Sequence, residues 1–408
     1  MARGRAVDGE PASAGPARYL RRLIAASMLA KIADWQMAIV VPLAILSETD
    51  SIGLVLFTVA LAGLPYAASP VLGALIDRLN KRTAIVAAQL QRSACLLLIA
   101  LTLDDPVIVG ALLLIGGFGS VIATITGQFV VIPTLFEEGA RENAVAKLAS
   151  AIELSKVVGL VLGGVIFAAL GPMTACLFVA GFYLVSGLAT MGLPSIPSQG
   201  ERTSLLNDLT IGFRWVAKRE ILWLVVTMAV SNLAVGEMET VLVTLFGAAG
   251  VETILVSSLL GVGLFAGAVG SRVGPRLLRS WTLERRIAGF QAMAFGALLV
   301  VAAPGLITKS VGFALLAFAL GASNVASITY RQNTIPVALA GRVNAVIRMF
   351  ITGAIPLSGF LYAAASSLGG TLFWVPGLLC AALSLVIWSL YTVAGARRQQ
   401  LGSAQISS

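Results

Sequence analysis

Charged side chains inside long apolar stretches are the residues of this chain best placed to do chemistry. If the first apolar stretch is helical, Asp34 lies about 20 Å beyond Arg21, near the middle of the stretch. Lys31 precedes Asp34 by one helical turn, so the two side chains share a helix face. A carboxylate held away from water can exchange a proton or contact a substrate. The alternative is a static Lys31/Asp34 ion pair that holds the helix in place.

Three more acidic residues are candidates for proton coupling or substrate contact. Glu153 and Lys156 repeat the spacing of Lys31 and Asp34, and we predict a structural ion pair between them. Glu237 and Glu239 have no basic neighbour and, being two residues apart, point to different faces of a helix. One of the two would face a cavity while the other meets headgroup water. The alternative is that both lie at the membrane interface.

Arg92 is one of four basic residues that lie inside predicted helices, with Lys31, Lys156 and Arg348. It would complement an acid across neighbouring helices, contact an anionic substrate, or form an ordinary interhelical ion pair. Other polar or aromatic groups within apolar stretches are candidates for lining a cavity, although helix packing and interfacial anchoring would also explain them. These cavity candidates are Trp35, Gln36, Tyr66, Gln128, Asn232 and Asn324.

The elements that must position these residues are membrane-spanning helices. The chain is 58% hydrophobic and 12% charged, with a mean hydropathy of +0.94, and its apolar runs have the length that a bilayer about 30 Å thick requires. The runs are too long for barrel strands, so the sequence predicts an all-α membrane protein. The predicted spans are 21–46, 51–75, 83–103, 106–134, 143–169, 172–193, 220–246, 251–273, 285–303, 306–331, 341–366 and 369–394.

Basic residues set the expected orientation. Most of the 28 Lys and Arg residues fall in the two tails and in alternate loops, whereas the opposite loops contain acidic residues and Lys309. By the positive-inside rule, we expect both termini to lie in the cytoplasm. We expect the protein to lie in the inner membrane of the cell. We expect a disordered cytoplasmic tail at 1–18, six-helix bundles at 19–193 and 220–394, a central cytoplasmic loop at 194–219 and a second tail at 395–408.

Several functional classes are disfavoured by missing residues. The sequence has no Gly-x-x-x-x-Gly-Lys-Ser/Thr loop for ATP and no histidine. The three cysteines lie in apolar stretches without metal-ligand spacing. We therefore expect no enzyme, no cofactor, no metal centre and no nucleic-acid partner. Two six-helix halves instead indicate a transporter with a cavity between its halves near the membrane midplane.

The loop between the second and third spans identifies a family. It reads Gly73-Ala-Leu-Ile-Asp77-Arg78-Leu-Asn-Lys81-Arg82 and resembles the Gly-x-x-x-Asp-Arg-x-x-Arg-Arg loop of the major facilitator superfamily. The resemblance implies two six-helix bundles related by a pseudo-twofold axis. It also implies that Asp77 locks the inner ends of helices two and eleven in the outward-facing state. We expect Arg331, Arg342 and Arg348 to join Asp77 in this cytoplasmic gate.

A second set of residues resembles one branch of that superfamily. Tyr330-Arg331-Gln332, the segment from Gly341 to Arg348 and Gly353-Ala-Ile-Pro356-Leu357 look like the signature of the drug:proton antiporter-3 or transmembrane secretion effector group. That branch includes macrolide and siderophore exporters and commonly carries an acid at the place of Asp34. The chain departs from its pattern at Leu160, and at Ser358, Tyr362 and Ala363, which replace glycines.

These observations predict a proton-coupled exporter of small amphipathic organic compounds such as a drug, a secondary metabolite or a siderophore. We expect a monomer whose partners are that small molecule, protons and membrane lipids. Two alternatives remain open at this point. The first is a lysophospholipid or metal-ion exporter of the same fold. The second is a membrane sensor or scaffold that transports nothing.

Overall fold

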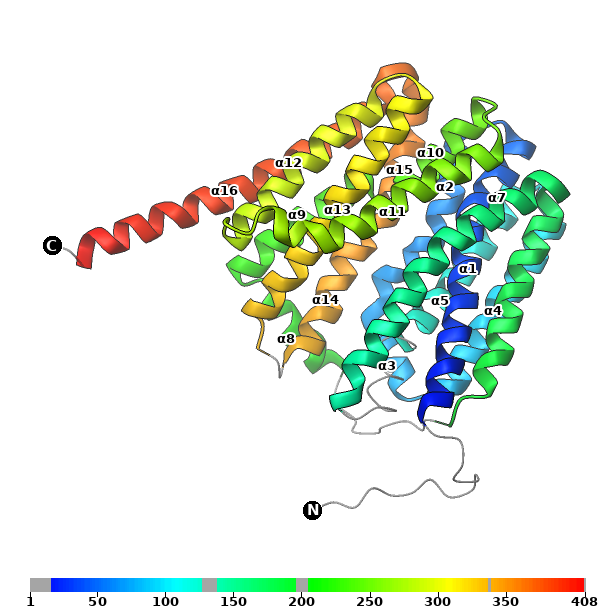
Figure 1. The fold of residues 1–408 in the computed structure, drawn as a ribbon, viewed down its shortest axis with the longest axis horizontal. Coiled ribbons are helices and arrows are strands. Elements are labelled where there is room, and N and C mark those ends of the chain that lie inside the picture. Colours follow the sequence, from blue (N-terminus) through cyan, green and yellow to red (C-terminus); the bar gives the residue numbers. More distant parts are fainter. Residues whose placement is uncertain (1–15, 127–137, 196–204, 337–338, 407–408) are drawn as a thin grey trace, which may run out of the picture.

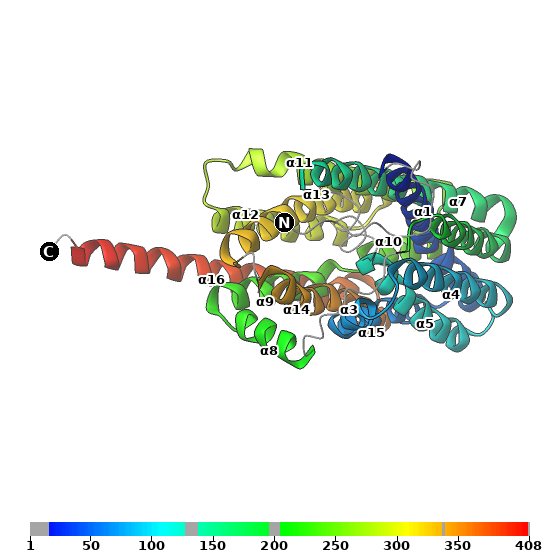
Figure 2. The same ribbon diagram turned by 90° about the horizontal axis from the view of Figure 1, so that it is seen from below.

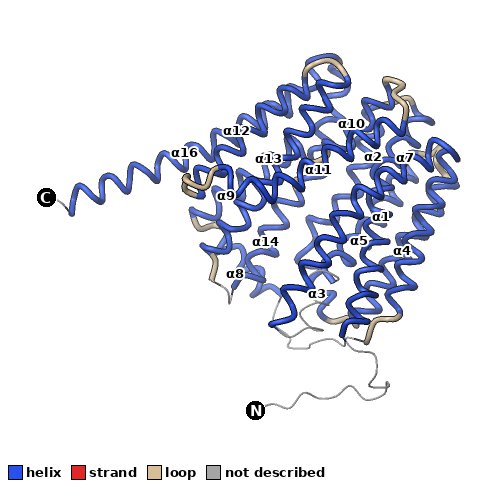
Figure 3. The backbone as a smooth tube through the Cα atoms, in the orientation of Figure 1, coloured by secondary structure: helices blue, strands red, loops and turns tan. Residues whose placement is uncertain are grey.

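A computed structural model describes residues 16–126, 138–195, 205–336 and 339–406, and the regular elements in these ranges are all helices (Figure 3). Eleven of the described helices are long and apolar enough to cross a membrane. The predicted all-α membrane fold is confirmed. The tail at 1–15 and Gln128 lie outside the described residues.

One helix accounts for two of the predicted spans. As a straight rod, α7 (Glu138–Met191) would be about 80 Å long, far more than a bilayer needs. Gly171 interrupts it with a φ of 77°, a left-handed conformation that glycine adopts without steric cost, and Pro172 follows. The chain reverses direction there (Figure 1), so that α7 contains the predicted spans 143–169 and 172–193.

The two halves of the chain lie side by side (Figures 1 and 2). The remaining elements of the N-terminal half are α1 (Pro16–Thr49), α2 (Ile52–Ala60), the 3-10 helix η1 (Leu61–Ala68), α3 (Ser69–Asp77), α4 (Lys81–Leu101) and α5 (Pro106–Thr126). Those of the C-terminal half are α9 (Arg219–Val235), α10 (Met238–Ala248), α11 (Thr253–Leu277), α12 (Leu283–Ala302), α13 (Leu306–Thr334), α14 (Ala340–Gly353), α15 (Ile355–Ala365), η4 (Ser366–Leu368), η5 (Gly370–Trp374) and α16 (Val375–Ile406).

Three predicted boundaries differ from the structure. The first helix begins at Pro16, within the predicted tail at 1–18. The predicted central loop contains a helix, α8 (Leu205–Val216), whose Asp208 forms an ion pair with Arg342 of α14 at 2.8 Å. The last helix continues to Ile406 rather than ending at residue 394, and it projects beyond the bundle (Figure 1). Hydropathy alone missed these helical segments because they are not continuously apolar.

Close approach of helices depends on small residues. A Cβ atom on Gly270 of α11 would lie 2.1 Å from the carbonyl oxygen of Phe318 in α13, and one on Gly321 would lie 2.2 Å from the carbonyl oxygen of Gly267. Both distances are shorter than any real Cβ contact, so the two helices touch backbone to backbone. Such contacts replace the hydrophobic driving force that helices lack within lipid.

Three spans are interrupted, and the interruptions meet. Pro65 lies in η1, between α2 and α3, and Pro356 lies in the first turn of α15, so neither nitrogen can donate a helical hydrogen bond. The third interruption, at Gly236 and Glu237, separates α9 from α10. A Cβ on Gly236 would lie 2.9 Å from Cα of Ile355, and one on Gly63 would lie 2.9 Å from Pro356. The three breaks are therefore packed against one another.

The two ends of the bundle differ in how tightly the halves meet. We call the end with the α3–α4 connection the basic end, because Arg78 and Arg82 flank it, and the end with the α1–α2 connection the acidic end. At the acidic end the halves are in close contact, since a Cβ on Gly53 would lie 3.5 Å from Cβ of Ser366 and one on Gly164 would lie 2.7 Å from Cβ of Ser257. At the basic end, a cavity of about 660 Å³ separates residues of both halves.

Candidate functional site

A cluster of charged groups crosses the N-terminal half at the level of Asp34. Lys31 Nζ donates to Asp34 Oδ2 at 2.7 Å, and Arg92 of α4 forms an ion pair with Asp34 Oδ1. The hydroxyl of Tyr183, from α7, donates to Asp34 Oδ1 at 2.9 Å and accepts a hydrogen bond from Arg92. The guanidinium carbon of Arg92 also lies 3.9 Å from the centre of the Tyr183 ring. We call Lys31, Asp34, Arg92 and Tyr183 the N-half cluster.

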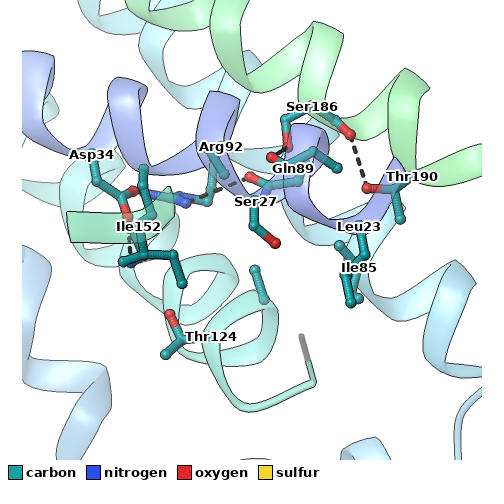
Figure 4. Close-up of a pocket in the computed structure, with 14 residues that line it drawn as sticks. Leu23, Ser27, Asp34, Ile85, Gln89, Arg92, Thr124, Ile152, Ser186 and Thr190 are labelled. Carbon is teal, nitrogen blue, oxygen red and sulfur yellow. Dashed lines mark hydrogen bonds and ion pairs between the residues drawn. The ribbon is translucent and has the colours of Figure 1, made fainter. Parts of the chain in front are cut away.

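The N-half cluster has an excess of positive charge, because two cations face one carboxylate. Arg92 is 4% exposed and Tyr183 is fully buried. A cavity of about 50 Å³ lies beside the cluster, and Figure 4 shows Asp34 and Arg92 at one side of it with Ser186 and Thr190 at the other. That volume holds water molecules rather than an organic compound. The cluster therefore ties α1, α4 and α7 together and carries a net positive charge.

Sequence reasoning identified three members of this cluster and missed Tyr183. Lys31 and Asp34 are marked by their spacing, and Arg92 by its depth in an apolar stretch. Tyr183 lies in an apolar run, where a tyrosine is typical of a packing residue, so nothing in the sequence indicates its contact with Asp34.

Gln36, one of the predicted cavity residues, is fully buried, and its amide oxygen and nitrogen have no hydrogen-bond partner among the described residues. It lies where Gly163 of α7 meets α1.

The break between α9 and α10 places Glu237 next to α15. The hydroxyl of Thr240 donates to Glu237 Oε2 at 2.8 Å, and the backbone N–H of Glu237 donates to Ser358 Oγ at 3.4 Å. The hydroxyl of Tyr362 donates to the carbonyl of Ala234, the last but one residue of α9, at 2.8 Å. No ion pair to Glu237 is recorded within the described ranges.

Ser358 and Tyr362 are two of the positions where the chain departs from the branch pattern, and both side chains form hydrogen bonds with the backbone. A helix break inside a membrane leaves backbone groups without helical partners, and each must be satisfied by protein. The two hydroxyls supply that hydrogen bonding at the α9–α10 break. Glycines at these positions would leave the same backbone groups without these partners.

The second predicted ion pair is formed near the interface of the halves. Lys156 Nζ lies 2.8 Å from Glu153 Oε1 and 6.0 Å from the centre of the Trp35 ring. Glu239, from the C-terminal half, lies within electrostatic range of Lys156. Half of the Glu153 side chain is exposed, so this pair is weaker than the N-half cluster.

Arginines dominate the cavity at the basic end. Arg331 Nη1 donates to Asn344 Oδ1 at 3.2 Å, and Arg342 Nε lies 2.8 Å from Asp208 Oδ1. The residues that line this cavity come from α3 and α5 of one half and from α8, α13 and α14 of the other. They are Ser69, Pro70, Gly73, Ile125, Asp208, Leu209, Ile328, Arg331, Gln332, Ala340, Gly341, Arg342, Asn344, Ala345 and Arg348.

The structure describes only some of the gate residues predicted in the loop from Gly73 to Arg82. Gly73 lines the cavity, but the side chain of Asp77 lies outside the described residues, so its contact with the arginines stays a prediction. Arg78 is exposed and Arg82 donates to the carbonyl of Leu193 at 3.1 Å. Lys81 does not anchor the surface, because it is 2% exposed and donates to the carbonyl of Ile76 near the end of α3 at 2.7 Å.

The other cavity candidates are scattered. Asn232 donates to the carbonyl of Ile351 at 2.6 Å, which ties α9 to α14. Tyr66 lies on η1, within electrostatic range of Lys31, Arg92 and Arg348. Asn324 is exposed on α13. Within the described part of the chain, no three His, Cys, Asp or Glu side chains gather in a way that would hold a metal ion.

Comparison with known proteins identifies the architecture. The model of the Major Facilitator Superfamily matches residues 23–358. No curated protein is significantly similar in sequence. Among solved structures, a bacterial homologue of the iron transporter ferroportin in an inward-facing state aligns with a TM-score of 0.74 and 17% identity, over 92% of this chain and 98% of that one.

Two further structures show the same fold at similarly low identity. The nucleoside transporter NupG has a TM-score of 0.71 at 13% identity, over 92% of this chain and 98% of that one. A bacterial metal transporter has a TM-score of 0.66 at 18% identity, over 92% and 98% of the two chains. These likenesses establish the fold.

Proposed function

Because the chain belongs to the Major Facilitator Superfamily, we propose that it is a secondary active exporter of small amphipathic organic compounds that works by alternating access. The observation that carries the proposal is the asymmetry of the two ends. The halves touch at Gly53 and Ser366 of the acidic end, whereas a cavity of about 660 Å³ lies between them at the basic end. This is the arrangement expected of one of two alternating states, open at one side only.

The charge distribution supports an orientation. Arg78, Arg82 and Arg342 lie at the basic end, and by the positive-inside rule that end faces the cytoplasm of a cell inner membrane. The cavity is then open to the cytoplasm, which is where an exporter takes up its cargo. Its size fits a small organic molecule, since ligand pockets commonly measure about 300 to 1,000 Å³. We propose that the monomer is the transporting unit.

Proton coupling is assigned to Glu237 rather than to Asp34. Asp34 is bound by two cations, and taking up a proton would cost both ion pairs. Glu237 has only the hydroxyl of Thr240 as a recorded side-chain partner and lies at the break between α9 and α10. A change in its charge would act directly on a discontinuous helix, where half-helices can move relative to one another.

Proteoliposomes with an imposed pH gradient test the coupling. The flux of two xanthene dyes, anionic fluorescein and cationic rhodamine 6G, is measured with and without the gradient. For the transported dye, Glu237→Gln should retain flux but lose the response to the gradient. Glu252→Gln, at an exposed position of the acidic end, is the matched control and should behave as the wild type. A gradient response that persists in Glu237→Gln would remove Glu237 from the coupling step.

A metal-ion exporter is the second candidate, because solved metal transporters share the fold. The charges of the described residues weigh against it, since the N-half cluster and the basic-end cavity both present more cations than carboxylates. Loading of vesicle-trapped calcein by external Mn²⁺ or Co²⁺ tests this candidate. Protein-dependent quenching of calcein would favour metal transport over our proposal.

A further inference from the structure

Among the described residues, the charged groups that line the basic-end cavity are mostly cations. Among the described lining residues, Arg331, Arg342 and Arg348 face a single carboxylate, that of Asp208. Asp208 is engaged by Arg342 at 2.8 Å. Arg331 makes its recorded hydrogen bonds to neutral acceptors, the carbonyl of Ser327 at 3.3 Å and Asn344 Oδ1 at 3.2 Å. Its positive charge is therefore held in place without being neutralised by these bonds.

A second set of cations approaches the same space from the N-terminal half. Tyr66 lies within electrostatic range of Lys31, Arg92 and Arg348. Arg348 is in turn close enough to Arg331 for their charges to repel. Tyr66 of the N-terminal half is therefore near cations of both halves.

Cations inside a membrane protein are costly unless an anion meets them, and a run of like charges adds mutual repulsion. Arg331 lines the cavity and makes its recorded hydrogen bonds to neutral acceptors, so its charge is available to an anionic cargo. The remaining described lining is suited to a molecule with an apolar part, because Ile125, Leu209 and Ile328 contribute aliphatic surface. A guanidinium also matches the geometry of a carboxylate, sulfonate or phosphate group.

We propose, building on the exporter assignment above, that the transported compound is an amphipathic organic anion whose acidic group binds Arg331 in the basic-end cavity. The N-half cluster, with two cations and one carboxylate, adds to the attractive potential. A cationic compound of the same size is disfavoured by that potential, since like charge raises the energy of entry. The charged head of an anionic lipid and that of a soluble organic acid share this chemistry, and the test separates them.

Binding to the full chain in nanodiscs of zwitterionic phosphatidylcholine provides the test. Fluorescein and rhodamine 6G share a xanthene core and carry opposite charge, so their fluorescence anisotropy compares charge at similar shape. We expect fluorescein to bind at least tenfold more tightly than rhodamine 6G and to weaken as salt is raised. Equal affinities, or no binding of fluorescein at the highest protein concentration that the nanodiscs allow, would overturn the proposal.

Matched arginine variants assign the site. Arg331→Gln should weaken fluorescein binding at least tenfold, whereas Arg331→Lys, which keeps the charge but not the guanidinium geometry, should recover part of it and thereby show that the fold is intact. Arg276→Gln removes an exposed arginine of α11 at the same end and should leave binding unchanged. An equal loss in Arg276→Gln and Arg331→Gln, or no loss in either, would contradict a site at Arg331.

Two further experiments distinguish a lipid from a soluble acid, and the anion site from the exporter assignment. Nanodiscs that contain phosphatidylglycerol should displace fluorescein from the wild type if a lipid head is the natural anion, and leave it bound if a soluble acid is. Flux in proteoliposomes then tests the exporter assignment by itself. Movement of rhodamine 6G without that of fluorescein would refute the anion and keep the transporter. Fluorescein binding that depends on Arg331, with no flux of either dye, would refute the transporter and keep the anion site.

Discussion

At the scale of single residues, the N-half cluster joins three helices through one carboxylate. Asp34 accepts from Lys31, Arg92 and Tyr183, which come from α1, α4 and α7. A buried charge pair is stable only when its remaining donors and acceptors are also satisfied. The Tyr183 hydroxyl meets that need twice, because it donates to the carboxylate and accepts from the guanidinium.

Tyr183→Phe should lower the free energy of unfolding by about 1 to 3 kcal/mol, because it removes one hydroxyl from a buried charged network while keeping the ring under Arg92. Unfolding by sodium dodecyl sulfate, followed by tryptophan fluorescence, measures the change. In an Asp34→Asn background the same substitution should cost clearly less, since the carboxylate that accepts the bond is gone. Equal costs in both backgrounds would show that Tyr183 acts through packing alone.

Residue types and spacing predict part of this cluster. The helical turn between Lys31 and Asp34 is sufficient to predict their contact, and the depth of Arg92 predicts that it needs an acid. Which acid Arg92 meets depends on how three helices are arranged, and a single sequence does not contain that information. The ion pair of Arg342 with Asp208 was missed for the same reason, because the two residues lie far apart in the chain.

At the scale of helices, contact between α11 and α13 depends on glycines that no other residue can replace without movement. Gly270→Ala places a methyl group 2.1 Å from the Phe318 carbonyl oxygen, so the helices must separate. We expect a loss of about 1 to 3 kcal/mol in the free energy of unfolding. Gly296→Ala in α12, where nothing lies within 4 Å of the added atom, is the control.

The same unfolding assay in detergent checks the glycine pair. Gly296→Ala should be neutral or stabilising by about 0.5 to 1 kcal/mol, because alanine restricts the unfolded chain and favours a helix. If both substitutions gave the same small change, the close approach of α11 and α13 would not contribute to stability.

Hydropathy predicts where helices cross the membrane but not where they break. The spans 51–75, 220–246 and 341–366 were predicted as continuous helices, and each contains an interruption. Pro65 and Pro356 are visible signals for two of these breaks. The third, at Gly236 and Glu237, depends on a tertiary contact with Ile355 and on hydroxyls of α15, which are invisible to any local rule.

At the scale of the whole molecule, transport requires that the tightly packed acidic end separates. A disulfide across that end tests this requirement. The position of a Cβ on Gly53 lies 3.5 Å from Cβ of Ser366, at the short limit of the separation found in disulfides. In a variant with Gly53→Cys and Ser366→Cys, oxidation should form the cross-link and reduce dye flux to the level of protein-free vesicles. Reduction should restore it.

The background and the control follow from the native cysteines. Cys95 and Cys176 are buried, whereas Cys380 is only half-buried and should be replaced by alanine to prevent side reactions. Gly53→Cys by itself should respond neither to oxidant nor to reductant. Full flux from the oxidised double variant would mean that the acidic end stays closed during turnover, and alternating access would be refuted.

The contacts of α8 attach it to one half of the molecule. Gly212 of α8 lies so close to α14 that an added Cβ would be 2.5 Å from Val346, and Asp208 holds Arg342. The helix is thus fastened to the C-terminal half, while Arg214 and Lys218 beside it remain exposed. An antibody fragment that recognises this outer surface would bind the C-terminal half and leave the N-terminal half free to rotate.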